Sequence, residues 1–269
     1  MIPRPRFAYF FALSAVLLAT GCATPPNDEA VEQGDDALTS VSDEDVARAQ
    51  STDISALSFE KLTPTSTRMM RAARWWMTAQ DKESRYPRPR MCASNVSKVL
   101  FLSGLTRIDQ EGVRMLIGNV QSVGGKVAKL SQNKSTFATQ LNGFAGGALP
   151  AGTIVAGMNV NTSAPGDQHI GVVGHTDPDG TVFVYHNNWY RPANAGGQRK
   201  PFMISDANLR RGFERQWMAT PWIRITRDAS GLITKVDSLL PALDDLDPFN
   251  PSFQITIALI PEVARELGQ

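Results

Sequence analysis

The spacing of apolar residues changes once along the chain, at residues 149–152 (Leu-Pro-Ala-Gly), and this change restricts the fold more than any other feature. Before it, apolar residues recur at three- and four-residue steps, which is typical of amphipathic helices. After it, short runs of branched and alternating apolar residues stand between turn-forming residues, which is typical of strands. Helices followed by antiparallel strands predict an α+β fold, with N-terminal helices packed on an antiparallel β-sheet.

Three helices are predicted before this point. The first begins near Thr65 and carries arginines on the face opposite its apolar residues. The second begins at Cys92, because the proline-containing segment 86–89 must be extended, and it ends at Gly104. The third runs from Asp109 to Val123 and is ended by two glycines. The apolar face of the first helix comprises Met69, Met70, Ala73, Trp76 and Met77.

Strands and one short helix are predicted after this point. The strands are Thr153–Met158, His169–Gly174, Thr181–His186, Trp222–Thr226 and Phe253–Ile260, and a short helix starts at Pro261. Residues 177–180 (Asp-Pro-Asp-Gly) have the composition of a tight turn, so they join the second strand to the third as a hairpin. We assign no chemistry to residues 229–269, which hold a linker, a strand and a helix.

Residues 1–21 have the organisation of a cleaved secretion signal. Arg4 and Arg6 precede an apolar run of about 15 residues, shorter than the roughly 20 that a membrane-spanning helix needs. The run ends in Leu-Ala-Thr-Gly-Cys, which resembles the lipobox of bacterial lipoproteins. This resemblance implies that Cys22 is lipidated and anchors the chain to a membrane of the bacterial cell envelope. By comparison with enterobacterial lipoproteins, Ala23 in place of an aspartate favours the outer membrane, facing the periplasm.

Residues 22–62 are predicted to form a flexible tether between this anchor and a catalytic domain at residues 63–228. Between residues 23 and 60 the chain has ten acidic residues, one arginine and a single aromatic residue. Such a composition buries too little apolar surface to offset the entropy of ordering, although Asp43–Gln50 has the pattern of a short helix. The domain starts with the opposite charge, since residues 61–90 hold eight basic and two acidic residues. This charge favours attraction to anionic envelope polymers.

Cysteine usage points to one reactive thiol. Two cysteines are too few for a disulfide framework or a four-cysteine zinc site. Once Cys22 is lipidated, Cys92 is the remaining thiol, and it has no disulfide partner in an oxidising compartment. A helix N-terminus stabilises a thiolate and lowers the pKa of a cysteine placed there. Cys92 is therefore a candidate nucleophile, and the alternative is an inert buried cysteine.

A thiolate nucleophile needs a base, and the predicted hairpin supplies histidines. If residues 177 and 180 flank a two-residue turn, Gly171 pairs with His186 and His169 pairs with Asn188. Because side chains of a strand alternate between its faces, the two histidines and Asn188 then share one face of the sheet. One extra residue at Gly180 would place Asn187 there in place of Asn188.

The third histidine, His175, is predicted to lie on the same face but far from the others. It follows His169 by six residues, or about 20 Å along a strand. That separation argues against a three-histidine zinc site, since ligands must lie about 2 Å from the ion. We interpret His175 as a structural residue.

Four segments are similar to the papain-like cell-wall hydrolases of the NlpC and CHAP families. Residues 92–100 resemble their nucleophile helix, which begins with a cysteine and packs on an antiparallel sheet. Residues 149–155 resemble the entry to their first strand, and 169–173 resemble the strand that starts with the catalytic histidine. Residues 184–189 resemble the end of the next CHAP strand, where His186 occupies the position of a glutamate. A second histidine is common in this role among NlpC-like enzymes.

The resemblance implies a papain-like fold and a cysteine peptidase or amidase. Cys92 is then the nucleophile, His169 the general base, and His186 or Asn188 the residue that orients the base. The implied substrates are peptidoglycan stem peptides or the muramyl-alanine amide bond, and we expect no metal, no cofactor and no nucleic-acid partner. The main alternative is a non-catalytic papain-like lipoprotein that binds wall glycopeptide or an envelope partner. Cleavage of, or acyl transfer to, a protein substrate is a third hypothesis.

Overall fold

Helices form where the three- and four-residue spacing predicts them. The computed structural model describes residues 41–82, 92–105, 112–161, 168–190, 214–240 and 244–269. Helix α3 (Pro64–Lys82) buries Met69, Ala73 and Trp76, as its apolar face requires. Helices α4 (Cys92–Leu102) and α5 (Val113–Ser122) follow it, and the predicted start of α5 at Asp109 lies outside the described residues.

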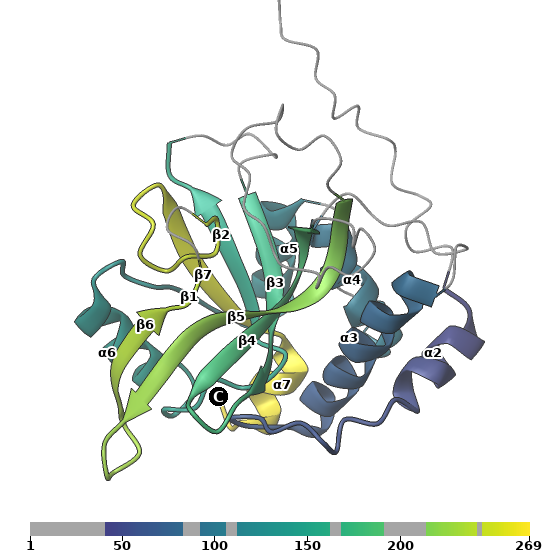
Figure 1. Cartoon of the computed structure of the whole chain (residues 1–269), viewed down its shortest axis with the longest axis horizontal. Coiled ribbons are helices and arrows are strands. Elements are labelled where there is room, and N and C mark those ends of the chain that lie inside the picture. Colours follow the sequence, from purple (N-terminus) through teal and green to yellow (C-terminus); the bar gives the residue numbers. More distant parts are fainter. Residues whose placement is uncertain (1–40, 83–91, 106–111, 162–167, 191–213, 241–243) are drawn as a thin grey trace, which may run out of the picture. The chain divides into compact units, whose positions relative to one another are not determined.

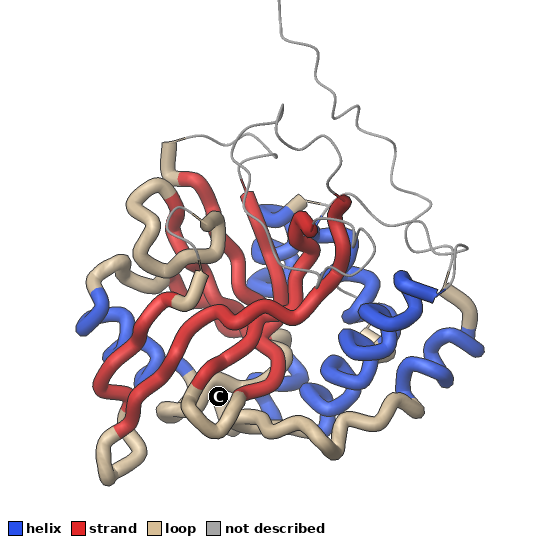
Figure 2. The backbone as a smooth tube through the Cα atoms, viewed as in Figure 1, coloured by secondary structure: helices blue, strands red, loops and turns tan. Residues whose placement is uncertain are grey.

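The α+β class is confirmed. In the described residues, six helices accompany one curled antiparallel sheet of seven strands in the order β1-β7-β2-β3-β4-β5-β6 (Figures 1 and 2). Helices α2, α3 and α4 lie together beside the sheet, while α6 lies against β6 (Figure 1). The predicted strands correspond to β2 (Ile154–Asn159), β3 (Gln168–Thr176), β4 (Thr181–Tyr190), β5 (Glu214–Arg227) and β7 (Phe253–Leu259), followed by α7 (Pro261–Glu266).

Three elements were not predicted from the sequence. Strand β1 (Lys126–Lys129) has four residues, too few to show a period, and in β6 (Ile233–Ser238) the two buried apolar residues stand three apart. Helix α6 (Lys134–Phe144) did carry a signal, because Phe137, Leu141 and Phe144 follow a helical spacing and are buried. The side chain of Asn133 caps this helix.

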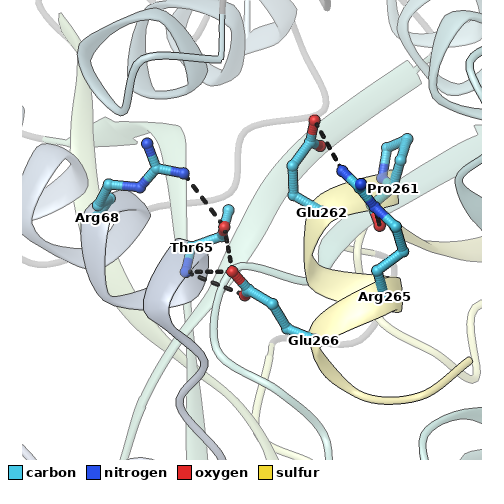
Figure 3. Close-up of polar contacts among 6 residues, drawn as sticks. All are labelled: Thr65, Arg68, Pro261, Glu262, Arg265 and Glu266. Carbon is cyan, nitrogen blue, oxygen red and sulfur yellow. Dashed lines mark hydrogen bonds and ion pairs between the residues drawn. The ribbon is translucent and has the colours of Figure 1, made fainter.

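The C-terminal segment belongs to the same sheet as the predicted domain. Strand β7 pairs with β1 on one side and with β2 on the other, and β6 pairs with β5. The predicted boundary at residues 228 and 229 is therefore wrong, because residues after it supply an interior strand and an edge strand. Helix α7 also contacts the start of the domain, where the carboxylate of Glu266 accepts hydrogen bonds from the backbone N–H and hydroxyl of Thr65 (Figure 3).

The second half of the predicted tether packs on the domain. Helix α2 (Asp43–Gln50) has a complete capping box at Ser42 and lies against α3 and α4. The amide of Gln50 donates to the backbone oxygen of Leu102 at 2.8 Å, and Ile54 is buried in the core. A few apolar and capping residues are therefore enough to order this charged segment against the domain. The prediction of a flexible tether is wrong for residues 41–62.

The remaining N-terminal predictions fall on residues 1–40, which lie outside the described part of the chain. These are the signal segment, the lipidated Cys22 and the first half of the tether. In the residues that the structure describes, no helix combines the length and the apolarity needed to cross a membrane.

Candidate active site

Cys92 is the first residue of α4, as predicted, and its side chain lies beside the first residue of strand β3. Its side chain is 8% exposed, and its Sγ lies 3.9 Å from the backbone oxygen of Gln168, to which it donates. A carbonyl oxygen lies about 3 Å from the next Cα across a trans peptide, so Sγ is within roughly 7 Å of the His169 Cα. The structure therefore places the thiol beside the residue that precedes the predicted base.

The nucleophile helix is held firmly in the core. Nearly all of α4 is buried, and it packs against β3 and β4 as well as α3 (Figure 1). The indole N–H of Trp76 donates to Oδ1 of Asn95 at 2.8 Å, which ties α3 to α4. The ammonium of Lys98 lies 5.9 Å from the centre of the same indole ring. These contacts fix the helix end that carries Cys92.

His169 and His186 meet on one face of the β3–β4 hairpin. Nε2 of His169 lies 2.8 Å from Nδ1 of His186, and the two rings are nearly perpendicular, at 74°. Strand pairing puts Gly171 opposite His186, as the sequence predicted. His169 is two residues before Gly171, so the histidines are diagonal neighbours across the strands.

Gly171 makes this close approach possible. A Cβ atom at this position would lie 2.7 Å from the backbone oxygen of Tyr185 and 2.8 Å from the Cβ of His186. Both distances are shorter than carbon atoms tolerate, so a larger residue would displace His186. The sequence contains this signal, since a glycine inside a strand often marks a close backbone or side-chain approach.

His186 is fully buried and has a second polar partner. Its Nε2 lies 2.9 Å from Oγ1 of Thr220 on β5, and burial lowers its pKa to about 3. The imidazole is therefore neutral at physiological pH, with one ring nitrogen protonated and the other an acceptor. Thr220 was not predicted, because the expected strand began at Trp222 and nothing local marks a threonine as a histidine partner.

The register near the turn differs from the prediction. Thr176 pairs with Val182, which is one residue out of step with the Gly171–His186 pair, and the shift falls between Val173 and Thr176. The turn is one residue longer than predicted, with Gly180 at a φ of +83°, and the irregularity in β3 compensates for it.

This irregularity turns His175 to the opposite face, so the prediction that it shares a face with His169 is wrong. Its ring stacks on Phe183 with 4.0 Å between centres, and its Nδ1 lies 2.9 Å from the hydroxyl oxygen of Tyr185. Phe183 and Tyr185 alternate with Val184 and His186 along β4. Burial lowers the pKa of His175 and raises that of Tyr185 to about 12.

Two asparagines follow His186 on β4. Asn187 is buried opposite Trp217, whose indole bonds to the backbone of α3, so its side chain lies on the face away from His186. This placement favours His186 over Asn187 as the residue that orients the base, and that role stays a prediction. Asn188 pairs with Gln216 through the backbone, and its side chain lies outside the described residues, so its role stays a prediction.

The described residues contain no group of three or more histidine, cysteine and acidic side chains suited to hold a metal ion. Within the described chain, Cys92 forms no disulfide. The structure joins two imidazoles and a hydroxyl by close polar contacts, and it places a thiol beside the residue that precedes His169. Such groups can support proton transfer and nucleophilic attack.

No protein family, curated protein or solved structure matches the chain.

Proposed function

We propose that the chain is an envelope-anchored cysteine hydrolase with a papain-like arrangement, and that it cleaves amide bonds in peptidoglycan. The observation that carries this proposal is the 2.8 Å contact between His169 and His186, next to a thiol at the start of a buried helix. A nucleophile, a base and a group that orients the base form the minimal set for covalent amide hydrolysis.

In this proposal the two nitrogens of His169 have different roles. Nε2 is engaged with His186, so proton exchange with the nucleophile falls to Nδ1. When His169 is protonated on both nitrogens, its Nε2–H donates to the neutral His186. This hydrogen bond fixes the ring orientation and stabilises the imidazolium without adding a second charge.

The reaction proceeds through a thioester. The sulfur of Cys92 attacks the amide carbon after its proton has passed to Nδ1 of His169. The C–N bond then breaks, and the same proton goes to the departing amine. A water molecule then attacks the thioester carbon and gives a proton to Nδ1 of His169. The C–S bond breaks, the carboxylic acid leaves, and the proton passes from His169 to the sulfur of Cys92.

The N-terminus of α4 stabilises the two negative charges of the reaction, which are the thiolate and the oxyanion. The first backbone N–H groups of a helix lack acceptors within the helix, and the helix dipole is positive at that end. Both effects stabilise the thiolate of Cys92, and N–H groups at this end can also bind the oxyanion of the tetrahedral intermediate.

The proposed substrate follows from charge, tethering and resemblance. If the segment from an acylated Cys22 to residue 40 is the flexible tether that its composition predicts, it spans on the order of 25 Å in its relaxed state. This is shorter than a tether to residue 62 would allow, because residues 41–62 pack on the domain. The basic start of the domain favours anionic wall polymers, and the NlpC and CHAP resemblance points to stem-peptide or muramyl-alanine amides.

The direct test uses the full chain with Cys22→Ser, which leaves Cys92 as its single thiol. Incubation with purified peptidoglycan should release fragments whose masses identify the cleaved bond. The matched variant Cys92→Ser should release none above background while keeping the same unfolding midpoint in urea. Equal release by the two proteins would overturn the proposal.

A second test needs no substrate. The rate at which iodoacetamide alkylates Cys92 should remain high below pH 7, because the thiolate is paired with an imidazolium and a helix N-terminus. His169→Gln should shift this profile toward that of an ordinary thiol. An ordinary profile in the parent protein would contradict activation of the cysteine.

A non-catalytic binding role is the second candidate, and low solvent exposure favours it. Cys92 is 8% exposed and His186 is 1% exposed. In this case the parent protein and Cys92→Ser bind peptidoglycan equally in a pull-down assay, and neither releases fragments.

A further inference from the structure

Thr220 has no assigned role in the resemblance or in the reaction above. It lies on β5, is 3% exposed, and its hydroxyl oxygen is 2.9 Å from Nε2 of His186. We infer that Thr220 is a positioning residue that holds His186 in the tautomer required for His169 to act as a base. This inference rests on the proposed function.

The two hydrogen bonds that link His169, His186 and Thr220 can form in either of two donor–acceptor patterns. In the first, Nε2–H of His169 donates to Nδ1 of His186, and Nε2–H of His186 donates to the Thr220 oxygen. In the second, the Thr220 hydroxyl donates to His186, and Nδ1–H of His186 donates to His169. A neutral imidazole has one donor and one acceptor, so these two patterns exclude each other.

Only the first pattern, in which His169 donates to His186 and His186 donates to Thr220, allows His169 to take the proton of Cys92. In the second, Nε2 of His169 is an acceptor, so its proton sits on Nδ1 and that nitrogen cannot take the proton of Cys92. The imidazolium form of His169 also requires the first pattern, because its Nε2–H must donate to His186. His186 must then carry its own proton on Nε2.

That proton needs an acceptor, and Thr220 supplies it. His186 is 1% exposed, and among the described residues its side chain hydrogen-bonds His169 and Thr220 alone. An N–H buried without a partner is unfavourable, which would drive the proton to Nδ1 and impose the inactive pattern. The hydroxyl oxygen of Thr220 has lone pairs that can accept this N–H.

The chain offers a matched control. Thr256 on β7 is also a buried strand threonine, 1% exposed, and its hydroxyl has no hydrogen-bond partner among the described residues. Thr256→Val therefore removes a hydroxyl from the core without touching the histidines. Thr220→Ser is the complementary variant, because it keeps the hydroxyl and loses one methyl group.

The experiment measures the tautomer directly. Histidine labelled with ¹⁵N in the full chain with Cys22→Ser reports, through two-bond ¹H–¹⁵N couplings, which nitrogen of His186 is protonated at pH 7. We expect Nε2–H in the parent protein, in Thr220→Ser and in Thr256→Val, and a shift toward Nδ1–H in Thr220→Val. On peptidoglycan fragments, kcat of Thr220→Val should fall about tenfold to a hundredfold with KM unchanged, and Thr220→Ser should restore it.

Three results would overturn the inference. They are Nδ1–H in the parent protein, an unchanged tautomer in Thr220→Val, and an equal loss of kcat in Thr256→Val. If Thr220→Val does not fold, the tautomers of the parent protein and Thr220→Ser decide. A parent protein that hydrolyses nothing refutes the proposed function, while the tautomer measurement still decides the role of Thr220 toward His186.

Discussion

The two ends of the β3–β4 hairpin each pair a histidine of β3 with an aromatic residue of β4. At one end, His169 contacts the imidazole of His186, and at the other, His175 contacts the phenol of Tyr185. The contact distances are nearly equal, at 2.8 Å and 2.9 Å. The pairs lie on opposite faces of the sheet because the register of β3 shifts between them.

The difference lies in what each partner can do with a proton. Tyr185 has a pKa raised to about 12 by burial, so it is a hydroxyl at every physiological pH and serves His175 as a fixed partner. His186 has two nitrogens in contact, so Nδ1 can accept a hydrogen bond from His169 while Nε2–H donates to Thr220. We therefore expect the identity of the partner, and not the presence of a histidine, to decide which pair takes part in proton transfer.

The largest expected difference comes from removing each histidine of β3. We expect His169→Gln to lower kcat on peptidoglycan by at least about a thousandfold, since the amide cannot act as a base. We expect His175→Gln to change kcat by less than about threefold, since it alters packing on the other face. Fragment release measured at saturating substrate checks both, and a comparable loss in His175→Gln would remove the distinction.

The glycines beside each pair give the next largest effect. A Cβ at Gly171 meets His186, whereas a Cβ at Gly174 meets the ring of Tyr185 at 2.6 Å. Each alanine substitution should lower the free energy of unfolding by about 2 kcal/mol, because the added carbon overpacks the core. Gly171→Ala should also lower kcat, and Gly174→Ala should not. Urea unfolding and fragment release separate the two, and unchanged kcat in both would show that His186 tolerates displacement.

Acid sensitivity of folding should distinguish the buried His186 from the half-buried His175. The pKa of His186 is about 3 in the folded chain against 6.5 without burial, so below pH 6.5 the unfolded chain binds more protons. Stability contributed by neutral His186 is therefore lost as pH falls from 6.5 toward 3, at about 1.4 kcal/mol per pH unit. His186→Asn should reduce the change in the free energy of unfolding between pH 5.5 and 4.5 by roughly 1 kcal/mol. His175→Asn should reduce this pH dependence by a smaller amount.

This measurement needs an Asp244→Asn background. Asp244 is 2% exposed, and burial raises its pKa from 3.8 to about 7. Between these values the folded chain binds more protons, so the contribution of Asp244 falls as pH rises and opposes that of His186. Urea titrations at the two pH values give the slopes, and identical slopes for both histidine variants would contradict the difference in burial.

The smallest effect is expected for the phenol itself. Tyr185→Phe removes the hydroxyl partner of His175 and should lower the free energy of unfolding by about 1 kcal/mol. It should leave kcat unchanged, in contrast to Thr220→Val at the other pair. Thermal or urea unfolding together with fragment release checks this, and a fall in kcat would show that the two ends of the hairpin are coupled.

Patterns of short range predicted much of this molecule. The apolar spacing in α3 and the placement of Cys92 at a helix start required information from a few neighbouring residues, and both agree with the structure. The pairing of Gly171 with His186 was predicted from a two-residue turn, and it holds because the irregularity in β3 offsets a turn that is one residue longer.

Features set by distant segments were not predictable. Thr220 reaches His186 from another strand, 34 residues away in sequence. The face of His175 depends on an irregularity that the length of the turn alone does not reveal. Residues 41–62 have the composition of a tether, yet bonds such as that from Gln50 to Leu102 order them against helices that form later in the chain.

The position of β7 has a consequence for biosynthesis. Strand β1 joins the sheet through β7 alone, and β2 has β7 as its outer neighbour, yet β7 comes after every other described strand. A ribosome that has made residues 1–250 has produced a sheet with a missing interior strand, so β1 has no place to dock. Completion of the sheet must therefore wait until residues 253–259 emerge from the ribosome.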